Sequence, residues 1–177
     1  MKELSLHILD IAQNSISAGC TKLELSLTEQ DGQLTLVIGD NGRGMTPEFL
    51  SSVTDPFTTT RTTRKVGLGL PLLRMAAEQT GGSLAIESTV GVGTTVTARF
   101  CSGHIDCPPL GDMAGTVALL VQGAPEVDTI YTHTTSRGSF TFDTREIRAV
   151  LGEGISLAEP EVAVWMRGYL EELEQSV

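Results

Sequence analysis

The stretch IGDNGRGM, residues 38–45, decides the fold, because it ends a strand pattern and begins a glycine-rich turn. Ahead of it Leu34, Leu36 and Ile38 recur at every second position, which predicts a half-buried strand. Asp40 then precedes two closely spaced glycines, Gly42 and Gly44. Asp, Asn and Gly are common turn residues for backbone reasons alone. The turn by itself therefore does not show whether a ligand binds there.

Upstream of this turn the sequence predicts a helix and a hairpin. Over residues 3–18 apolar side chains recur at helical spacing, and Gly19 follows where such a helix would end. Residues 22–30 alternate and predict a strand, and the Asp31-Gly32 pair after them is a strong hairpin-turn signal. The second strand of this hairpin then brings the chain to Asp40.

Downstream of the turn the pattern changes to a short helix and a long loop. Thr46 is placed to cap a helix whose first residue is Pro47. Residues 53–66 are rich in Thr and basic residues and show little periodicity, which predicts a loop of lid length. A helix and two strands follow, at residues 68–80, 84–88 and 94–100.

The C-terminal part of the chain has its own set of elements. Residues 101–110 contain glycine and two prolines and are predicted to form a linker. The patterns beyond it indicate a helix (112–122), two strands (129–134 and 139–142) and two helices (145–151 and 160–174). In the last helix an apolar stripe includes Trp165, the only tryptophan. We expect this stripe to pack on the hairpin of the tail; a partner or dimer surface is the alternative.

A cluster of potential ligands lies in the predicted linker. Cys101, His104, Asp106 and Cys107 fall within seven residues. The spacing lacks the further ligand pair of a familiar zinc pattern, so we do not expect a zinc site. His133, within a predicted strand, is expected to be structural.

Composition narrows the class of protein. The 177 residues carry a net charge of −10, which disfavours direct nucleic-acid binding, and 40% are hydrophobic, enough for a folded core. No apolar run approaches the length of a membrane span. The N-terminal stretch has no secretory cleavage pattern, and three cysteines are too few for a disulfide framework. These features predict a cytoplasmic protein.

Four separated segments carry the chemistry. They read LDIAQNSISAG (9–19), DNGRGM (40–45), KVGLGLPLL (65–73) and GVGTTVTARF (91–100). In the first, Asp10 and Asn14 are four residues apart and share one helix face. In the third, Gly67 and Gly69 open a helix whose free N–H groups suit a phosphate. Each segment alone is a weak signal, but their order and spacing are not.

In this order the segments resemble the ATPase family shared by DNA gyrase, the heat-shock chaperone of the same fold, histidine kinases and MutL-type repair proteins (GHKL ATPases). The first three are similar to its N, G1 and G2 boxes, and DPFTTT (55–60) is similar to the F box of histidine kinases. The resemblance covers residues 1–103. It implies a two-layer α/β sandwich with a mixed, mostly antiparallel sheet and helices on one face. Residues 104–177 would be a small α+β extension of unknown role.

The resemblance also implies roles for individual residues. Asn14 is expected to ligate Mg²⁺, because its carbonyl oxygen is a hard donor. Asp40 is expected to accept a hydrogen bond from the adenine amino group of ATP, which guanine cannot supply at that position. Gly42 and Gly44 would let the backbone pass close to the base. Thr94 would be a second adenine contact, through water.

Other box residues are expected to complete the nucleotide site. Gly67 and Gly69 would bring the start of a helix beneath the phosphates. Cations of the loop would meet the γ-phosphate, although a solvated loop is the alternative. The residues expected to contact the cofactor from the boxes and the loop are Met45, Phe57, Arg61, Arg64, Lys65, Leu68 and Leu70.

Asp10 occupies the position at which hydrolases of this family carry a glutamate general base. It could orient or deprotonate a water or an acceptor hydroxyl, although it is one methylene shorter than glutamate. Only six residues precede His7, so the sequence predicts no phosphoacceptor hairpin upstream. His7 itself is expected to be a packing or surface residue rather than an acceptor.

The architecture then resembles the stand-alone anti-sigma-factor kinases. The first functional hypothesis is a protein kinase that phosphorylates a partner protein, such as a transcription regulator, in trans. The alternative is a nucleotide-gated binding module with little or no phosphotransfer. Both require a protein partner and neither requires a membrane. A homodimer is left open.

Overall fold

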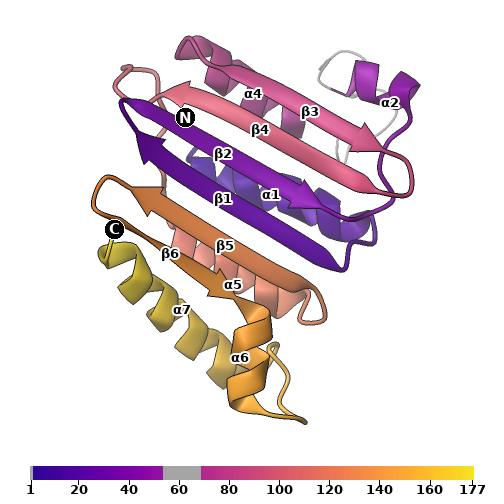
Figure 1. Ribbon diagram of the computed structural model, residues 1–177, viewed down its shortest axis with the longest axis vertical. Helices are drawn as coiled ribbons and strands as arrows, with labels where there is room; N and C mark the ends of the chain where they lie inside the picture. The colour runs from indigo at the N-terminus through magenta and orange to yellow at the C-terminus, as the bar shows by residue number, and fades with distance from the viewer. Residues whose placement is uncertain (1, 54–68) are drawn as a thin grey trace.

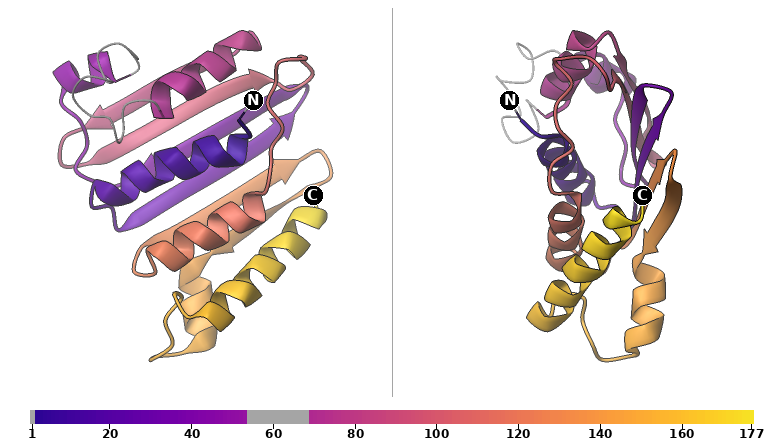
Figure 2. Two further views of the ribbon diagram at one scale, coloured as in Figure 1. Left: turned by 180° about the vertical axis from the view of Figure 1, so that it is seen from behind. Right: turned by 90° about the vertical axis from the view of Figure 1, so that its left-hand side faces the viewer.

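The computed structural model describes residues 2–53 and 69–177. Within this part of the chain one sheet carries helices against one face (Figures 1 and 2). The strands are β1 (Lys22–Gln30), β2 (Gln33–Asp40), β3 (Ser83–Thr89), β4 (Gly93–Cys101), β5 (Asp128–Thr135) and β6 (Gly138–Asp143). The helices are α1 (Leu4–Ser17), α2 (Pro47–Ser52), α4 (Gly69–Gln79), α5 (Met113–Gly123), α6 (Thr144–Leu151) and α7 (Pro160–Gln175).

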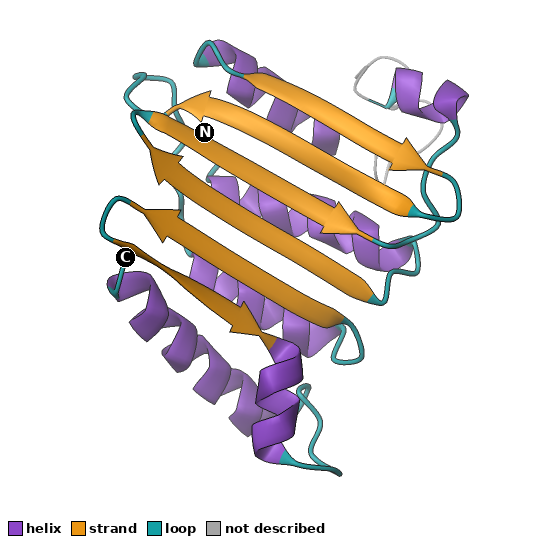
Figure 3. Cartoon of the chain, in the orientation of Figure 1, coloured by secondary structure: helices purple, strands orange, loops and turns teal. Residues whose placement is uncertain are grey.

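The six strands follow the order β3-β4-β2-β1-β5-β6 (Figure 3). Neighbouring strands are antiparallel except β1 and β5, which are parallel. The β1–β2 hairpin turns at Asp31 and Gly32, both with positive φ, as a two-residue turn of this kind requires. In the β2–β4 pairing Asp40 is opposite Thr94, so two residues from distant boxes meet at one end of the sheet.

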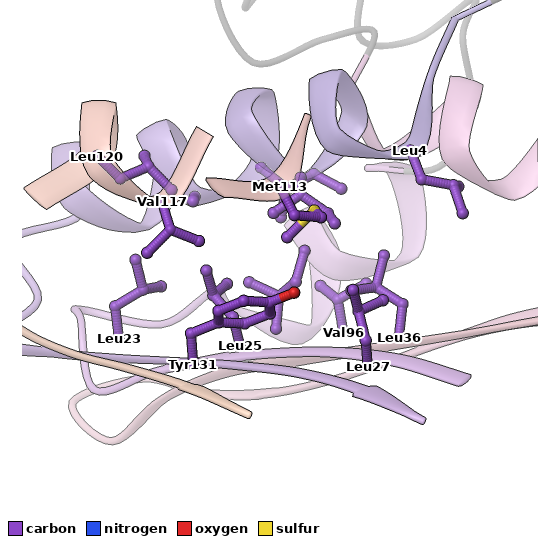
Figure 4. Close-up of a cluster of buried hydrophobic side chains, with 14 of the residues drawn as sticks. Leu4, Leu23, Leu25, Leu27, Leu36, Val96, Met113, Val117, Leu120 and Tyr131 are labelled. Carbon is purple, nitrogen blue, oxygen red and sulfur yellow. The ribbon is translucent and has the colours of Figure 1, made fainter. Parts of the chain in front are cut away.

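The core lies between the sheet and the helix layer. Alternation in β1 puts Leu23, Leu25 and Leu27 on the covered face, and all three are buried. Helix side chains such as Leu4 and Val117 point down onto them (Figure 4). The apolar face that a period of two gives each strand therefore packs against the apolar face that a period of 3.6 gives each helix.

Residues 104–177 extend this same sheet and helix layer. β5 pairs with β1 from Lys22↔Asp128 onward, and β6 adds the edge strand beyond it. α5 packs beside α1, and α7 packs beside α5. The predicted fold class is confirmed: a mixed α/β sheet with helices packed on one face. The division of the chain at residue 103 remains a prediction.

The sequence predicts a linker at residues 101–110, but Cys101 is the last residue of β4. Residues 102–112 contain neither helix nor strand. They are nevertheless fixed to the start of α1, because the N–H groups of Leu4 and Ser5 donate to the carbonyls of Pro109 and Leu110 at 2.9 Å each. The linker therefore helps to set where α1 begins.

The stripe of α7 packs within the tail, as predicted. Met166 and Leu170 are fully buried, and the Tyr169 ring lies 6.3 Å from that of Phe142 in β6. Trp165 stacks on Tyr169 with ring centroids 5.4 Å apart and keeps 48% of its surface exposed. This tryptophan caps the packed stripe rather than lying inside it.

Candidate functional site

Asp40, the last residue of β2, has its carboxylate fixed by two donors. The Ser15 hydroxyl of α1 donates to Oδ2 at 2.6 Å, and the Gly42 N–H donates to Oδ1 at 2.8 Å. Ser15 is 5% exposed, so its hydroxyl needs a partner in the protein. Because two donors hold it, the carboxylate has a defined orientation at the end of the strand.

A cavity of about 450 Å³ opens beside this carboxylate. It lies between α1, α2, the start of α4 and the paired ends of β2 and β4. Apolar side chains supply much of the wall, among them Ile11, Ile38, Phe49 and Val96. Of the residues predicted for the site, the cavity brings together Asn14, Asp40, Gly44, Met45, Leu70 and Thr94. A mostly apolar wall with a few fixed polar groups is typical of a small-molecule site.

The glycines of the turn allow close backbone packing. Gly44 has φ 73°, and a β-carbon there would overlap the Thr89 carbonyl oxygen of the β3–β4 turn. A β-carbon at Gly42 would lie 3.0 Å from the Ala18 carbonyl oxygen at the end of α1. The glycines thus let the turn wedge between α1 and the β3–β4 turn; their predicted approach to a base stays a prediction.

Hydrogen bonds tie the same turn to its surroundings. Asn41 accepts from the N–H groups of Thr21 and Lys22 at 2.8 and 3.0 Å. The Arg43 guanidinium donates to the Ser17 carbonyl at 2.7 Å, and the Arg43 N–H donates to Ala18 at 3.0 Å. These hydrogen bonds anchor the turn that follows Asp40 to the end of α1 and the start of β1.

Thr94 is positioned by Ser88, a residue that the sequence interpretation missed. The two hydroxyl oxygens lie 2.7 Å apart, and Ser88 also accepts from the Met45 N–H at 2.8 Å. Ser88 therefore links β3, β4 and the turn after Asp40. Its only sequence signal is a small polar residue near a strand end, which is too common to single it out.

Ser15 was also missed, although its signal was stronger. It lies on the apolar stripe of α1, in register with Leu4, Ile8 and Ile11, and all four are buried. A hydroxyl on a buried stripe must find a partner, which predicts a specific acceptor nearby. The acceptor, Asp40, is 25 residues away in sequence.

Asn14 and Asp10 have different surroundings despite sharing a helix face. Asn14 lines the cavity, and among residues 2–53 and 69–177 its side chain amide makes no hydrogen bond, so its oxygen is available to a ligand. Asp10 does not line the cavity. Its carboxylate pairs with the Lys2 ammonium at 2.5 Å. Gly42 and Gly69 also lie beside the cavity rather than in its wall.

Several predicted site residues lie outside the described part of the chain. These are Phe57, Arg61, Arg64, Lys65, Gly67 and Leu68.

Two of the histidines considered in the sequence are buried in the structure. No group of three or more potential metal ligands occurs in the described part of the chain, and the expectation that Cys101, His104 and Cys107 form no zinc site stays a prediction. His133 is 3% exposed and is hydrogen-bonded to Glu29 at 3.0 Å and Glu174 at 2.8 Å. His7 is also buried.

None of the helices described here combines the length and apolar character needed to cross a membrane.

Comparison with known proteins places this geometry in a family. Residues 2–103 match the family described as Histidine kinase-, DNA gyrase B-, and HSP90-like ATPase. Histidine protein kinase DivJ of Caulobacter vibrioides is 34% identical over 105 residues, and sensor protein SrrB of Staphylococcus aureus is 32% identical over 105 residues. Each alignment covers 56% of this chain and 18% of the relative, so the chain matches less than a fifth of their length.

A solved structure supports the fold. The crystal structure of the N-terminal domain of a DNA repair protein superposes with a TM-score of 0.60 at 14% identity, over 87% of this chain and 58% of that one. Residues 2–103 are an ATP-binding domain of the kind found in histidine kinases. The chain belongs to the histidine kinase-, DNA gyrase B- and HSP90-like ATPase family.

Proposed function

We propose that this chain binds Mg·ATP in the cavity beside Asp40 and transfers the γ-phosphoryl group to a partner protein. The observation that carries the proposal is the Asp40 carboxylate, fixed by Ser15 and Gly42 at the mouth of an apolar cavity that also holds Asn14. The family of residues 2–103 supports the same assignment.

One group of cavity residues contacts the base of the nucleotide, and another contacts the triphosphate. Asp40 accepts a hydrogen bond from the adenine amino group, and Thr94, held by Ser88, is the second polar contact to the base. Apolar residues such as Ile38 and Val96 pack on the faces of the ring. The triphosphate then extends toward Asn14 and the start of α4 at Gly69, whose dipole favours negative charge.

Asn14 fits a magnesium site because its amide oxygen is a hard, neutral donor without a competing hydrogen bond in the described part of the chain. When bound, Mg²⁺ supplies charge neutralisation on the triphosphate oxygens. Asn14 would hold the ion, and oxygens of phosphate and water usually supply its other ligands.

In the transfer step the bond between the γ-phosphorus and the β–γ bridging oxygen breaks, and a bond to the acceptor oxygen or nitrogen forms. A hydroxyl acceptor gives its proton to Asp10, whereas a nitrogen acceptor attacks through its free lone pair, and in both cases ADP leaves. The acceptor is a side chain of the partner, either a response regulator-type or transcription-regulator protein. We place the reaction in the cytoplasm, with no direct contact to nucleic acid.

A nucleotide-gated binding module is the second candidate, and one observation favours it. Asp10 lies outside the cavity wall and is paired with Lys2, so its carboxylate is not directed at the cavity. In that case ATP binding would present a surface to the partner, and phosphotransfer would be slow or absent.

The first test is ATP binding by Asp40→Asn, measured by isothermal titration calorimetry. The amide oxygen can still accept one hydrogen bond, so the fold should survive, but the adenine contact is lost and binding should become undetectable. Glu87→Gln removes one charge from an exposed position of β3 and serves as the control. Normal ATP binding by Asp40→Asn would overturn the proposal.

The second test separates the two candidates. A pull-down with and without Mg·ATP, followed by phosphosite mapping, identifies the partner and any acceptor. Asp10→Asn should then abolish labelling of that partner by γ-labelled ATP while retaining ATP affinity. A variant that signals normally with no labelled partner would favour the gated module instead.

A further inference from the structure

Lys2 makes a contact that neither the family motifs nor the cavity explains. Its side chain runs along α1, and the ammonium lies 2.5 Å from Oδ2 of Asp10, eight residues further on. The side chains of both residues remain partly open to solvent, at 37% and 46% exposure. An ion pair of two exposed groups contributes little to stability, so the contact invites a functional explanation.

The pair lies beside the phosphate end of the proposed site. Asp10 is one helical turn before Asn14 on α1. A β-carbon placed on Gly69 would lie 3.8 Å from the Asn14 amide nitrogen and 3.8 Å from Cβ of Asp10. Asp10 and Asn14 therefore both lie close to the start of α4. The Lys2 ammonium, paired with Asp10, lies next to them.

The charges make an exchange of partners favourable. A terminal phosphate carries more charge than a carboxylate and offers three acceptor oxygens, and an ammonium is a compact charge with three rotatable donors. Lys2 is held by one partner through a flexible four-carbon stem, so its head can move without moving α1. The Lys2 ammonium is thus held next to Asp10, one helical turn from Asn14 on α1.

We propose that Lys2 is a phosphate-binding residue that stays paired with Asp10 until a nucleotide binds. On nucleotide binding the Lys2 ammonium leaves Asp10 for the terminal phosphate of the triphosphate, and the Asp10 carboxylate is released beside the same phosphate. The inference rests on the proposed function. It adds that the base becomes free only when the γ-phosphate is present, because ADP lacks the group that draws Lys2 away.

The experiment compares ATP and ADP binding by calorimetry for the wild type, Lys2→Met and Lys2→Arg, with any purification tag at the C-terminus. Lys2→Met should weaken ATP binding about tenfold and ADP binding less than about twofold, and Lys2→Arg should retain ATP affinity within about threefold. Lys22→Met is the matched control: Lys22 pairs with Glu24 at 3.2 Å on the sheet, away from the cavity of the site.

A direct readout of the exchange is the side-chain ¹⁵N resonance of Lys2, assigned by its loss in Lys2→Met. It should shift on addition of ATP and not on addition of ADP. Equal losses of ATP and ADP affinity in Lys2→Met, or an unchanged ATP affinity, would overturn the inference while leaving the proposed function intact. A wild-type chain that binds neither nucleotide would remove the proposed function and this inference together.

Discussion

The Ser15 hydroxyl donates a 2.6 Å hydrogen bond to the Asp40 carboxylate and so joins the buried face of α1 to the end of β2. Asp40 is thereby oriented from the helix side by Ser15 and from the turn side by the Gly42 N–H. A carboxylate with both oxygens engaged has little freedom to rotate. Its remaining lone pairs therefore point in a fixed direction, and such preorganisation would lower the entropic cost of binding a ligand there.

The first prediction concerns this hydrogen bond. Ser15→Ala leaves Asp40 with one donor, so ATP affinity should fall about five- to twentyfold, equivalent to about 1–2 kcal/mol. Calorimetric titration with ATP measures the effect. Ser26→Ala, on the uncovered face of β1, is the control and should bind as the wild type does. A Ser15→Ala variant with unchanged affinity would show that Ser15 only packs.

The second prediction separates two reasons for a glycine. Gly44 and Gly91 have nearly the same φ, 73° and 78°, but a β-carbon at Gly44 would overlap Thr89 whereas one at Gly91 would meet nothing within 4 Å. Gly91→Ala should cost about 1 kcal/mol of unfolding free energy from backbone strain alone. Gly44→Ala should cost about 2–3 kcal/mol more, measured by urea denaturation. Equal losses would mean that the turn adjusts freely.

The third prediction concerns Ser88. Removing its hydroxyl in Ser88→Ala leaves the Met45 N–H and the Thr94 hydroxyl without their partner. The free energy of unfolding should fall by about 1–2 kcal/mol. Ser139→Ala breaks a comparable hydroxyl pair with Thr134 at an exposed site and should cost less than about 0.5 kcal/mol. If the two variants lose the same stability, Ser88 is not a positioning residue.

The fourth prediction is a pH dependence from His133. Burial alone lowers the pKa of His133, but hydrogen bonds to Glu174 and Glu29 outweigh it and raise the pKa above its usual value. Tyr131, whose pKa is raised by its own burial, also donates to Glu174. Because the folded pKa is raised, this stabilisation is complete below about pH 6.5 and is lost as pH rises through the folded pKa.

Urea denaturation between pH 6 and 9 tests this dependence. The stability advantage of the wild type over His133→Asn should be largest at pH 6 and should shrink with rising pH. Ser139→Ala removes no titratable group and should give a difference that does not vary with pH. A His133→Asn difference that stays constant over the range would contradict the prediction.

The fifth prediction has the opposite sign. Burial, helped by the charge of Lys2 and opposed by that of Asp10, lowers the pKa of His7, and its Nδ1 has no hydrogen-bond partner among the residues described. The unfolded chain therefore binds the proton more readily, and stability is lost as pH falls below about 6.5. His7→Leu should lose less stability than the wild type between pH 6.5 and 5. A parallel decline in both proteins would refute this.

Much of the fold could be predicted from periodicity alone. β1 has the predicted bounds of residues 22–30, and Thr46 caps α2 by accepting from the Phe49 N–H at 3.2 Å. These features depend on neighbours in sequence, where alternation, caps and turn residues act. The family could also be predicted, because each box is a short sequence pattern and the boxes occur in the order typical of the family.

What could not be predicted depends on pairing across long stretches of chain. Nothing in residues 128–135 shows that they pair with β1, because parallel partners leave no local signal. Likewise His133 meets Glu29 across 104 residues, and Ser15 meets Asp40 across 25. The contact of Lys2 with Asp10 could not be predicted either, because it depends on the path of the backbone just before α1.

The parallel pairing of β1 with β5 also sets an order of events during synthesis. Lys22 leaves the ribosome 106 residues before its partner Asp128, since 128 − 22 = 106. At about 5–20 residues per second, β1 therefore remains an unpaired edge for roughly 5 to 20 s. Such an edge can join another nascent chain. In the folded chain β5 covers this edge of β1, and a version cut at residue 103 would leave it open to pairing with another chain.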